Sequence, residues 1–302
     1  MKFGVREICN VVFRATAPQT IGASTFEKGQ PVLYIDSAKA STLEGAATSV
    51  YATGGRGNTR LVTWEGEKTL SFSVEDALIS QMGLAILSGA GLIKGNSTQK
   101  VHVHTTMSTT LDSEKKIDVS KFFDNTTSNI CDQAPIFIVK TEADGSLTGV
   151  SSKGTLDSSA KKISLNAGTN FVANDKVFVD FYVWKKADTV SEIIIDASHF
   201  AGSYYVEAET LFRRQTDGFD APVAITLPNV KIQSNFTFSM ASSGDPSTFN
   251  FQMDAHPGYT YFNPDKEVLC VMQVIEEKVA VENPWESVMM ETGKHADIAA
   301  EG

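Results

Sequence analysis

The sequence predicts a mainly β protein that contains a single α-helix. Apolar and polar residues alternate over many short segments, which is the period of a half-buried strand. Only one segment, just before the Gly-rich stretch at 88–95, has apolar residues at convincing helical spacing. Clusters of glycine, proline, asparagine and serine separate the segments at short intervals, as in proteins whose strands are joined by turns.

The helix is predicted within a segment that begins as a strand, LVTWEGEKTLSFSVEDALIS at 61–80. Residues 69–74 alternate between polar and apolar side chains, which predicts a strand. Ser73 is followed three residues later by Asp76, a near match to an N-terminal capping box, and apolar residues then continue at helical spacing to Gly89. We therefore expect a helix of about four turns that starts near Ser73 and ends at Gly89.

Further strands are predicted where short runs of β-branched and aromatic residues are bounded by turn residues. These runs cover 32–35, 136–139, 178–184, 192–196 and 204–212. Alternating apolar residues at 232–240 and 249–253 flank the turn sequence at 243–246, which predicts a hairpin with one apolar face. A lone hairpin is barely stable in water, so we expect this face to pack on the strand and helix described above.

Two segments differ from the rest of the chain. Residues 36–60 are small and polar, with four glycines and no clear period, which predicts a loop that becomes ordered on assembly. Residues 111–187 carry turn residues roughly every ten positions, which favours a small inserted β-sandwich. We therefore expect a main domain formed by 1–110 and 188–302, with an inserted β domain at 111–187.

Length and charge narrow the classes of protein. A chain of 302 residues allows one large or two modest domains, and we favour two. The net charge of −10, without any Lys/Arg run longer than two residues, argues against tight nucleic-acid binding, although an acidic surface would let DNA slide past. No stretch approaches the roughly 20 apolar residues of a membrane helix, and charges interrupt the N-terminal segment where a secretory signal needs an apolar core. We expect synthesis and assembly in a cytoplasm.

The candidate motifs for nucleotide or metal binding are weak. GGRGNTR at 54–60 lacks the Gly-Lys-Ser/Thr ending of a phosphate loop, and SGAGLIKG at 88–95 follows a helix where a dinucleotide site must follow a strand. His102 and His104 would share one face of a strand and could bind a metal together, but no third ligand is visible nearby. Two exposed histidines on an edge strand are the simpler interpretation.

The candidate catalytic groups are equally weak. The three cysteines are spread along the chain and odd in number, which favours reduced thiols: Cys9, Cys131 and Cys270. No serine lies in a nucleophile elbow. Carboxylate pairs such as Glu207 with Glu209, or Asp217 with Asp220, could serve acid/base chemistry, but solvated strand and turn residues explain them more simply. We expect neither enzymatic activity nor a cofactor.

Three segments carry a family resemblance. They are RLVTWEGEKTLSFSVEDALISQMGLAILSGAG at 60–91, the strand-rich stretch from GSYYVEAETLF to FNFQMDA at 202–255, and VFRATAPQT with PVLYIDSAKASTLEGAATSVYATGGRGN at 12–20 and 31–58. They resemble, in turn, the strand that leads into the helix, the C-terminal strands with their polar turn, and the N-terminal arm with the long loop of the major tail tube proteins of tailed bacteriophages.

The resemblance implies a tail-tube-type β-sandwich or barrel with one flanking helix. It does not cover the middle segment, which we expect to be immunoglobulin-like because some phage tail proteins carry such domains. The resemblance also implies a structural virion protein of the tail, which forms hexameric rings that stack into a tube for DNA ejection. Its partners would be further copies of itself, the tape-measure protein, baseplate or tail-tip proteins and, in a contractile tail, the sheath; DNA would pass without tight binding, and no membrane is involved. On the arm and the loop we expect contacts between subunits or rings at Arg14, Glu44, Tyr51, Arg56 and Arg60. A phage head or head-decoration protein and a carbohydrate-binding tail adhesin are the alternatives.

Overall fold

The computed structural model divides the chain into two compact units, each described here by itself. Unit 1 comprises Met1–Gly91 and Ile195–Gly302, and unit 2 comprises Leu92–Ile194. The structure describes residues 2–5, 7–21, 24–89, 91–94, 98–124, 128–166, 170–186, 190–195, 197–237, 242–243 and 247–276. The domain limits taken from the sequence, 111 and 187, stay predictions.

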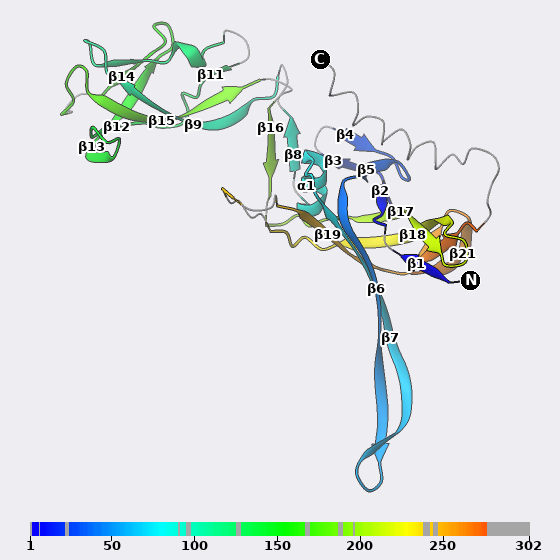
Figure 1. Ribbon diagram of the computed structural model, residues 1–302. Helices are drawn as coiled ribbons and strands as arrows, with labels where there is room; N and C mark the ends of the chain where they lie inside the picture. Colours follow the sequence, from blue (N-terminus) through cyan, green and yellow to red (C-terminus); the bar gives the residue numbers. More distant parts are fainter. Residues whose placement is uncertain are drawn as a thin grey trace. The chain divides into compact units, whose positions relative to one another are not determined.

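Unit 1 is built on a nine-stranded sheet (Figure 1). Its strands are β1 (Phe3–Val5), β2 (Asn10–Ala15), β5 (Pro31–Ile35), β6 (Ala38–Gly54), β7 (Thr59–Asp76), β17 (Ser203–Arg214), β18 (Asp220–Ile232), β19 (Phe249–Ala255) and β22 (Val271–Val274). Seven of them follow the order β5-β2-β17-β18-β19-β7-β6, while β1 pairs with β17 and β22 pairs with β18. Two small hairpins complete the unit: β3 (Gln19–Ile21) with β4 (Ser24–Phe26), and β20 (Gly258–Thr260) with β21 (Asn263–Val268).

The core of unit 1 covers one face of this sheet. Phe13 of β2, Phe72 of β7 and Phe251 of β19 are fully buried in one apolar cluster. The Phe13 ring lies 5.9 Å from that of Phe251 and meets the Tyr204 ring edge-on at 6.1 Å. Burial raises the pKa of Tyr204 to about 12. The strands predicted at 32–35 and 204–212 are confirmed as parts of β5 and β17, and the strand predicted at 178–184 is confirmed as part of β15 (Lys176–Lys185) in unit 2.

The single helix of the described chain, α1 (Gln81–Ser88), starts later than predicted. Its N-cap is Ser80, whose side chain accepts a hydrogen bond from the Gly83 N–H at 2.8 Å. The predicted start at Ser73 is wrong because β7 remains a strand to Asp76, where β19 pairs with it. The predicted end at Gly89 is confirmed: this glycine has φ 68, and its N–H caps the Ala85 carbonyl.

The segment predicted to be a loop, 36–60, instead forms most of a long hairpin. β6 occupies Ala38–Gly54 and pairs with β7 across a turn at residues 55–58. Gly55 and Gly57 in that turn have φ of 77 and 91, which favours glycine. The sequence shows no apolar alternation here because most of β6 is exposed on both faces within the chain.

The predicted hairpin at 232–253 is only partly formed. β18 ends at Ile232 and pairs with β19 over Val230–Ile232 alone. The predicted packing is confirmed only for the helix, because Ile86 and Leu87 of α1 share the buried core cluster with the apolar face of β19. The strand β7 instead lies beside β19 in the same sheet, paired with it from Phe249 to Asp254. Phe236 lies outside a strand and packs against the core partly buried, while residues 238–241 and 244–246 lie outside the described residues.

Unit 2 contains a seven-stranded sheet and its own apolar core. Its elements are β8 (Gly91–Lys94), β9 (Val101–Thr110), β10 (Lys116–Asp118), the 3-10 helix η1 (Ser120–Phe122), β11 (Ser128–Ile130), β12 (Ile136–Thr141), β13 (Leu147–Asp157), β14 (Lys162–Leu165), β15 (Lys176–Lys185) and β16 (Ser191–Ile194). The order is β10-β14-β13-β12-β15-β11, with β9 also paired to β15, while β16 and β8 pair separately. Ile138, Val179 and Phe181 are fully buried in this core.

Replacing Phe251 with alanine should destabilise the protein by about 3 to 5 kcal/mol, because the variant leaves a cavity between β19, β2 and α1. Urea unfolding of the full chain, followed by circular dichroism, measures this loss. Phe262→Ala is the matched control: this phenylalanine is 94% exposed, and we expect a change within about 0.5 kcal/mol. A loss below about 1 kcal/mol for Phe251→Ala would contradict the core assignment.

Candidate assembly interface

The β6–β7 hairpin is the candidate interface, because part of it has no packing partner among the described residues. β19 pairs with β7 only from Ser71 to Asp76, so residues 59–70 pair on the β6 side alone. Among the described strands, β6 pairs only with β7 and forms an edge of the sheet. Figure 1 shows the two strands extending beyond the sheet of unit 1. We call residues 49–65 the distal hairpin.

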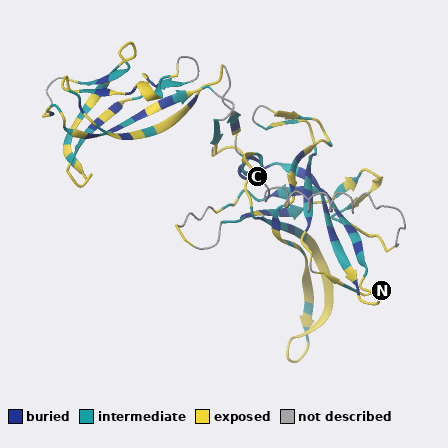
Figure 2. Cartoon of the chain, turned by 45° about the horizontal axis from the view of Figure 1, so that its top comes forward, coloured by how far each residue is buried: buried dark blue, intermediate teal, exposed yellow. Residues whose placement is uncertain are grey.

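One face of the distal hairpin is apolar. Val50 lies directly opposite Trp64, and Ala52 lies opposite Val62, so these four side chains share a face. Val50 is 63% exposed and Trp64 is 54% exposed. Figure 2 shows the exposure of this part of the chain. Burial of such side chains is favourable by roughly 25 cal/mol per Å², so the face is a surface that association can cover.

The other face combines an aromatic ring with a cation. Tyr51 lies opposite Thr63, and the Arg60 guanidinium carbon is 3.8 Å from the centre of the Tyr51 ring. Arg56 lies in the turn between the two glycines and is exposed. Three of the five predicted contact residues are therefore on the distal hairpin or its turn.

The remaining two predicted contact residues lie elsewhere on the sheet. Glu44 is on the part of β6 nearer the sheet, opposite Ser71 of β7. Arg14 is on β2, where its Nε is 2.8 Å from the Glu207 carboxylate and its guanidinium donates to the Gly29 carbonyl at 3.4 Å. Arg14 is thus engaged within its own chain. That any of the five residues contacts another subunit stays a prediction.

The solvent face of the sheet beside Glu44 is polar and acidic. Glu44, Ser71 and Asp254 form one row across β6, β7 and β19. Farther along the same face, Glu75 of β7 lies opposite Asn250 of β19. Along β7 and β19 these polar side chains alternate with buried residues such as Phe72 and Phe251, so the sheet has one apolar and one hydrophilic face.

Sequence reasoning missed the apolar side chains of the distal hairpin. Val50 lies within the segment interpreted as a loop, and Leu61 and Trp64 lie between that segment and the strand predicted at 69–74. The available signal was the sequence TRLVTW, which is rich in strand-forming residues and directly follows the turn sequence GGRGN.

The histidines and cysteines do not form a metal site in the described part of the chain. His102 and His104 share a face of β9, and His104 Nε2 lies 2.6 Å from the Asp180 carboxylate on β15. No group of three His, Cys, Asp or Glu side chains that could hold a metal occurs among the described residues. The cysteines are free, and burial raises the pKa of Cys9 and of Cys270, which disfavours a reactive thiolate.

The carboxylate pairs considered for acid/base chemistry are mostly occupied by arginines. Glu207 pairs with Arg14, Asp217 with Arg214, and Asp220 with Arg213. Hydrogen bonding from Arg213 lowers the pKa of Asp220. Burial, with a smaller effect of the Glu207 charge, raises the pKa of Glu209.

No helix among the described residues has the length and apolar character needed to cross a membrane.

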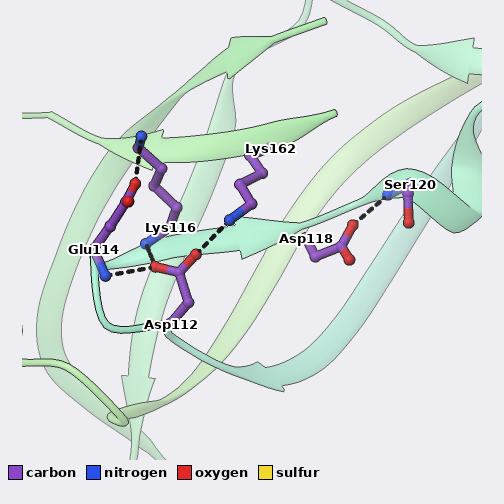
Figure 3. Close-up of polar contacts among 6 residues, drawn as sticks. All are labelled: Asp112, Glu114, Lys116, Asp118, Ser120 and Lys162. Atoms are coloured by element: carbon purple, nitrogen blue, oxygen red, sulfur yellow. Dashed lines mark hydrogen bonds and ion pairs between the residues drawn. The ribbon is translucent and has the colours of Figure 1, made fainter. Parts of the chain in front are cut away.

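A charged cluster in unit 2 holds a turn together (Figure 3). Asp112 Oδ1 accepts hydrogen bonds from the N–H groups of Glu114 and Lys116 at 2.9 and 2.7 Å, and its Oδ2 lies 2.8 Å from Lys162 Nζ. The Lys162 hydrogen bond, followed by the Lys116 N–H, lowers the pKa of Asp112. Lys116 Nζ also lies 2.8 Å from the Glu114 carboxylate, so the charged groups drawn in Figure 3 pair within the turn and the cluster is structural.

These features define a mainly β protein with an exposed hairpin suited to association. A protein-family model described as the YomU/Tube protein family matches residues 23–258. The chain belongs to this family, which is a phage-associated family of tube proteins, so the resemblance stated above is confirmed. It is a phage tube-like structural protein; the family suggests a component of the virion tail and a role other than catalysis. No curated protein matches the chain.

Replacing Lys162 with methionine should raise the pKa of Asp112 toward its ordinary value. A lowered pKa adds stability that is present above the ordinary Asp pKa and is lost as the pH falls through the lowered value, so the variant should lose less stability on acidification. Carboxyl-carbon NMR of Asp112 across pH measures the shift, with Lys153→Met on β13 as the control. An unchanged pKa in Lys162→Met would show that the pair does not form in solution.

Proposed function

We propose that the chain assembles into hexameric rings, which stack as the tail tube of a phage and form a conduit for DNA ejection. Membership of the YomU/Tube family supports the tube, and the exposed distal hairpin is the observation that carries self-association. We also propose that the chain has a tail-tube-type sandwich or barrel, that unit 2 is immunoglobulin-like and that assembly takes place in a bacterial cytoplasm. The proposed partners are the tape-measure protein, baseplate or tail-tip proteins and the sheath.

The distal hairpin supports association between copies for two reasons. A two-stranded ribbon is marginally stable in water unless one of its faces packs on something. No other described strand pairs with the outer edge of either strand of the distal hairpin, and the Val50 and Trp64 side chains are exposed. A neighbouring copy of the same chain can pair with the β6 edge and cover this apolar face. Repeating that contact head to tail closes a ring.

The distribution of charge supports a conduit for DNA. Unit 2 contains twelve lysines, no arginine and twelve acidic residues, so the net charge of −10 belongs entirely to the residues of unit 1. The solvent face of the unit 1 sheet carries Glu44, Glu75 and Asp254 among hydroxyl and amide side chains. A lumen lined by such a face repels phosphates and therefore lets DNA move.

Replacing residues 50–64 with Asn-Gly should abolish rings and tubes while the remaining fold stays intact. Ser49 and Glu65 are directly opposed, so the two-residue turn closes the shortened hairpin in register. Negative-stain microscopy of concentrated protein measures assembly, and circular dichroism confirms folding. The wild-type chain should form rings or tubes under the same conditions.

The matched control is Phe262→Ala, which removes an exposed aromatic residue from the β20–β21 hairpin and leaves the distal hairpin unchanged. Normal tubes from the shortened variant would refute the assigned role of the hairpin. A wild-type chain that remains monomeric at every concentration and salt condition tested would refute self-assembly itself.

Replacing Glu44, Glu75 and Asp254 together with lysine should make assembled tubes retain DNA. Wild-type tubes should not shift a DNA fragment in a gel at physiological salt, whereas the variant should, and added salt should release the DNA. Asp144→Lys, Asp157→Lys and Glu142→Lys in unit 2 add the same charge away from this face and serve as the control. Equal retention by both triple variants would contradict a lumen on the unit 1 sheet.

A further inference from the structure

The outer face of the unit 2 sheet carries a row of aromatic side chains on strands β12, β15 and β9. Phe178, Tyr182 and Trp184 alternate along β15 with the buried Val179 and Phe181 set, so they point away from the core. Phe137 of β12 lies opposite Asp180 of β15, and Asp180 lies between Phe178 and Tyr182 along that strand. Phe137 is 41% exposed and Tyr182 is 39% exposed. We call this surface the aromatic face of unit 2.

Polar groups are placed among these rings. Asp180 is flanked by Phe137 on one side and Thr106 on the other. His104 lies opposite Tyr182, with the two ring centres 5.3 Å apart, and its Nε2 contacts Asp180 at 2.6 Å. His102 lies opposite Trp184. A carboxylate has about four acceptor sites and an imidazole both donates and accepts, so these groups can still bond a ligand.

One end of the aromatic face is cationic. Lys100 Nζ lies 4.6 Å and Lys186 Nζ lies 5.6 Å from the centre of the Trp184 ring. Two ammonium groups held near one ring create a local positive charge in a unit whose lysines and acidic residues balance overall. The Asp180–His104 pair lies farther along the face, between Phe178 and Tyr182, so the acidic and the cationic groups are separated along β15.

From these contacts we propose that the aromatic face of unit 2 binds a glycan that carries acidic groups, such as a polysaccharide with carboxylate or phosphate substituents. The C–H face of a sugar ring stacks on the electron-rich faces of Tyr182 and Phe137. Its hydroxyl groups bond Asp180 and His104, and an acidic substituent pairs with Lys100 and Lys186. This binding is independent of tube assembly, because every residue involved lies within unit 2.

The same groups argue against an apolar protein partner. A protein surface that covered the rings would also desolvate Asp180 and both lysines, and buried charges cost several kcal/mol unless they find partners. The cores of protein interfaces are depleted in charged residues for this reason. A glycan offers apolar faces and hydroxyl groups at spacings of a few ångströms, so it can satisfy the rings and the polar groups together.

The test uses the full-length chain and two kinds of probe. An array of bacterial surface polysaccharides identifies binding, and calorimetry with oligogalacturonate and with its neutral methyl ester measures the effect of the acidic groups. The wild-type chain should bind members of the array and prefer the acidic oligomer. Tyr182→Ala should weaken binding about tenfold, which corresponds to one lost stacking contact, whereas Tyr182→Phe should stay within about twofold. Lys100→Ala with Lys186→Ala should abolish the preference for the acidic form.

Val172→Ala is the control, because this residue is exposed in the loop before β15 and outside the aromatic face. Thermal melts show that each variant is folded. Absence of binding to every polysaccharide and oligomer at millimolar concentration overturns the proposal. So does binding that Tyr182→Ala leaves unchanged, or protection of Tyr182 from solvent in assembled tubes without glycan, which would identify the face as a contact between copies.

Discussion

The two-sided pairing of β7 organises unit 1. Over Ser71–Asp76 this strand is bonded to β6 on one side and to β19 on the other, and it places Phe72 and Val74 in the core. Beyond Ser71 the pairing with β19 ends while that with β6 continues to Thr59. The same strand is therefore a fixed part of the core at one end and half of an unsupported ribbon at the other. The core anchors the ribbon without covering it.

This anchoring changes the energetics of association. The sequence suggested a loop at 36–60 that would lose conformational entropy on joining a neighbour. In the structure the backbone of this segment is already extended and paired, so less ordering remains to oppose binding. What remains exposed is an edge strand with apolar side chains, and proteins that stay monomeric protect such edges with charge, proline or a covering element. Between Ser49 and Gly54, β6 contains neither a charged residue nor a proline.

The sequence predicted the parts of the fold whose residues are buried within one chain. β15 and β17 alternate clearly because their inner faces fill the cores, and Gly89 ends α1 because its φ favours glycine. The start of α1 could not be predicted, because Ser73 and Asp76 form a local capping pattern that pairing with β19 overrides. The ribbon was missed because its faces are exposed in the single chain. Apolar and polar residues alternate in a sequence only where one face of the strand is buried within that chain. Tyr51 and Arg60 were proposed as contact residues through a resemblance, whereas the shared face of Val50 and Trp64 could be recognised only from the register.

The two units differ in chemistry, which favours separate roles. Unit 1 holds the whole net negative charge and the unsupported ribbon, and both suit a wall that repels DNA and joins to copies of itself. Unit 2 is balanced in charge, has a separate core, and displays aromatic rings beside hydrogen-bonding groups. Because its sheet is complete without strands from unit 1, changes on its outer face need not disturb the pairing of β7. A tube protein can therefore carry a recognition surface on the inserted unit while the acidic sheet and its ribbon remain under the separate constraint of assembly.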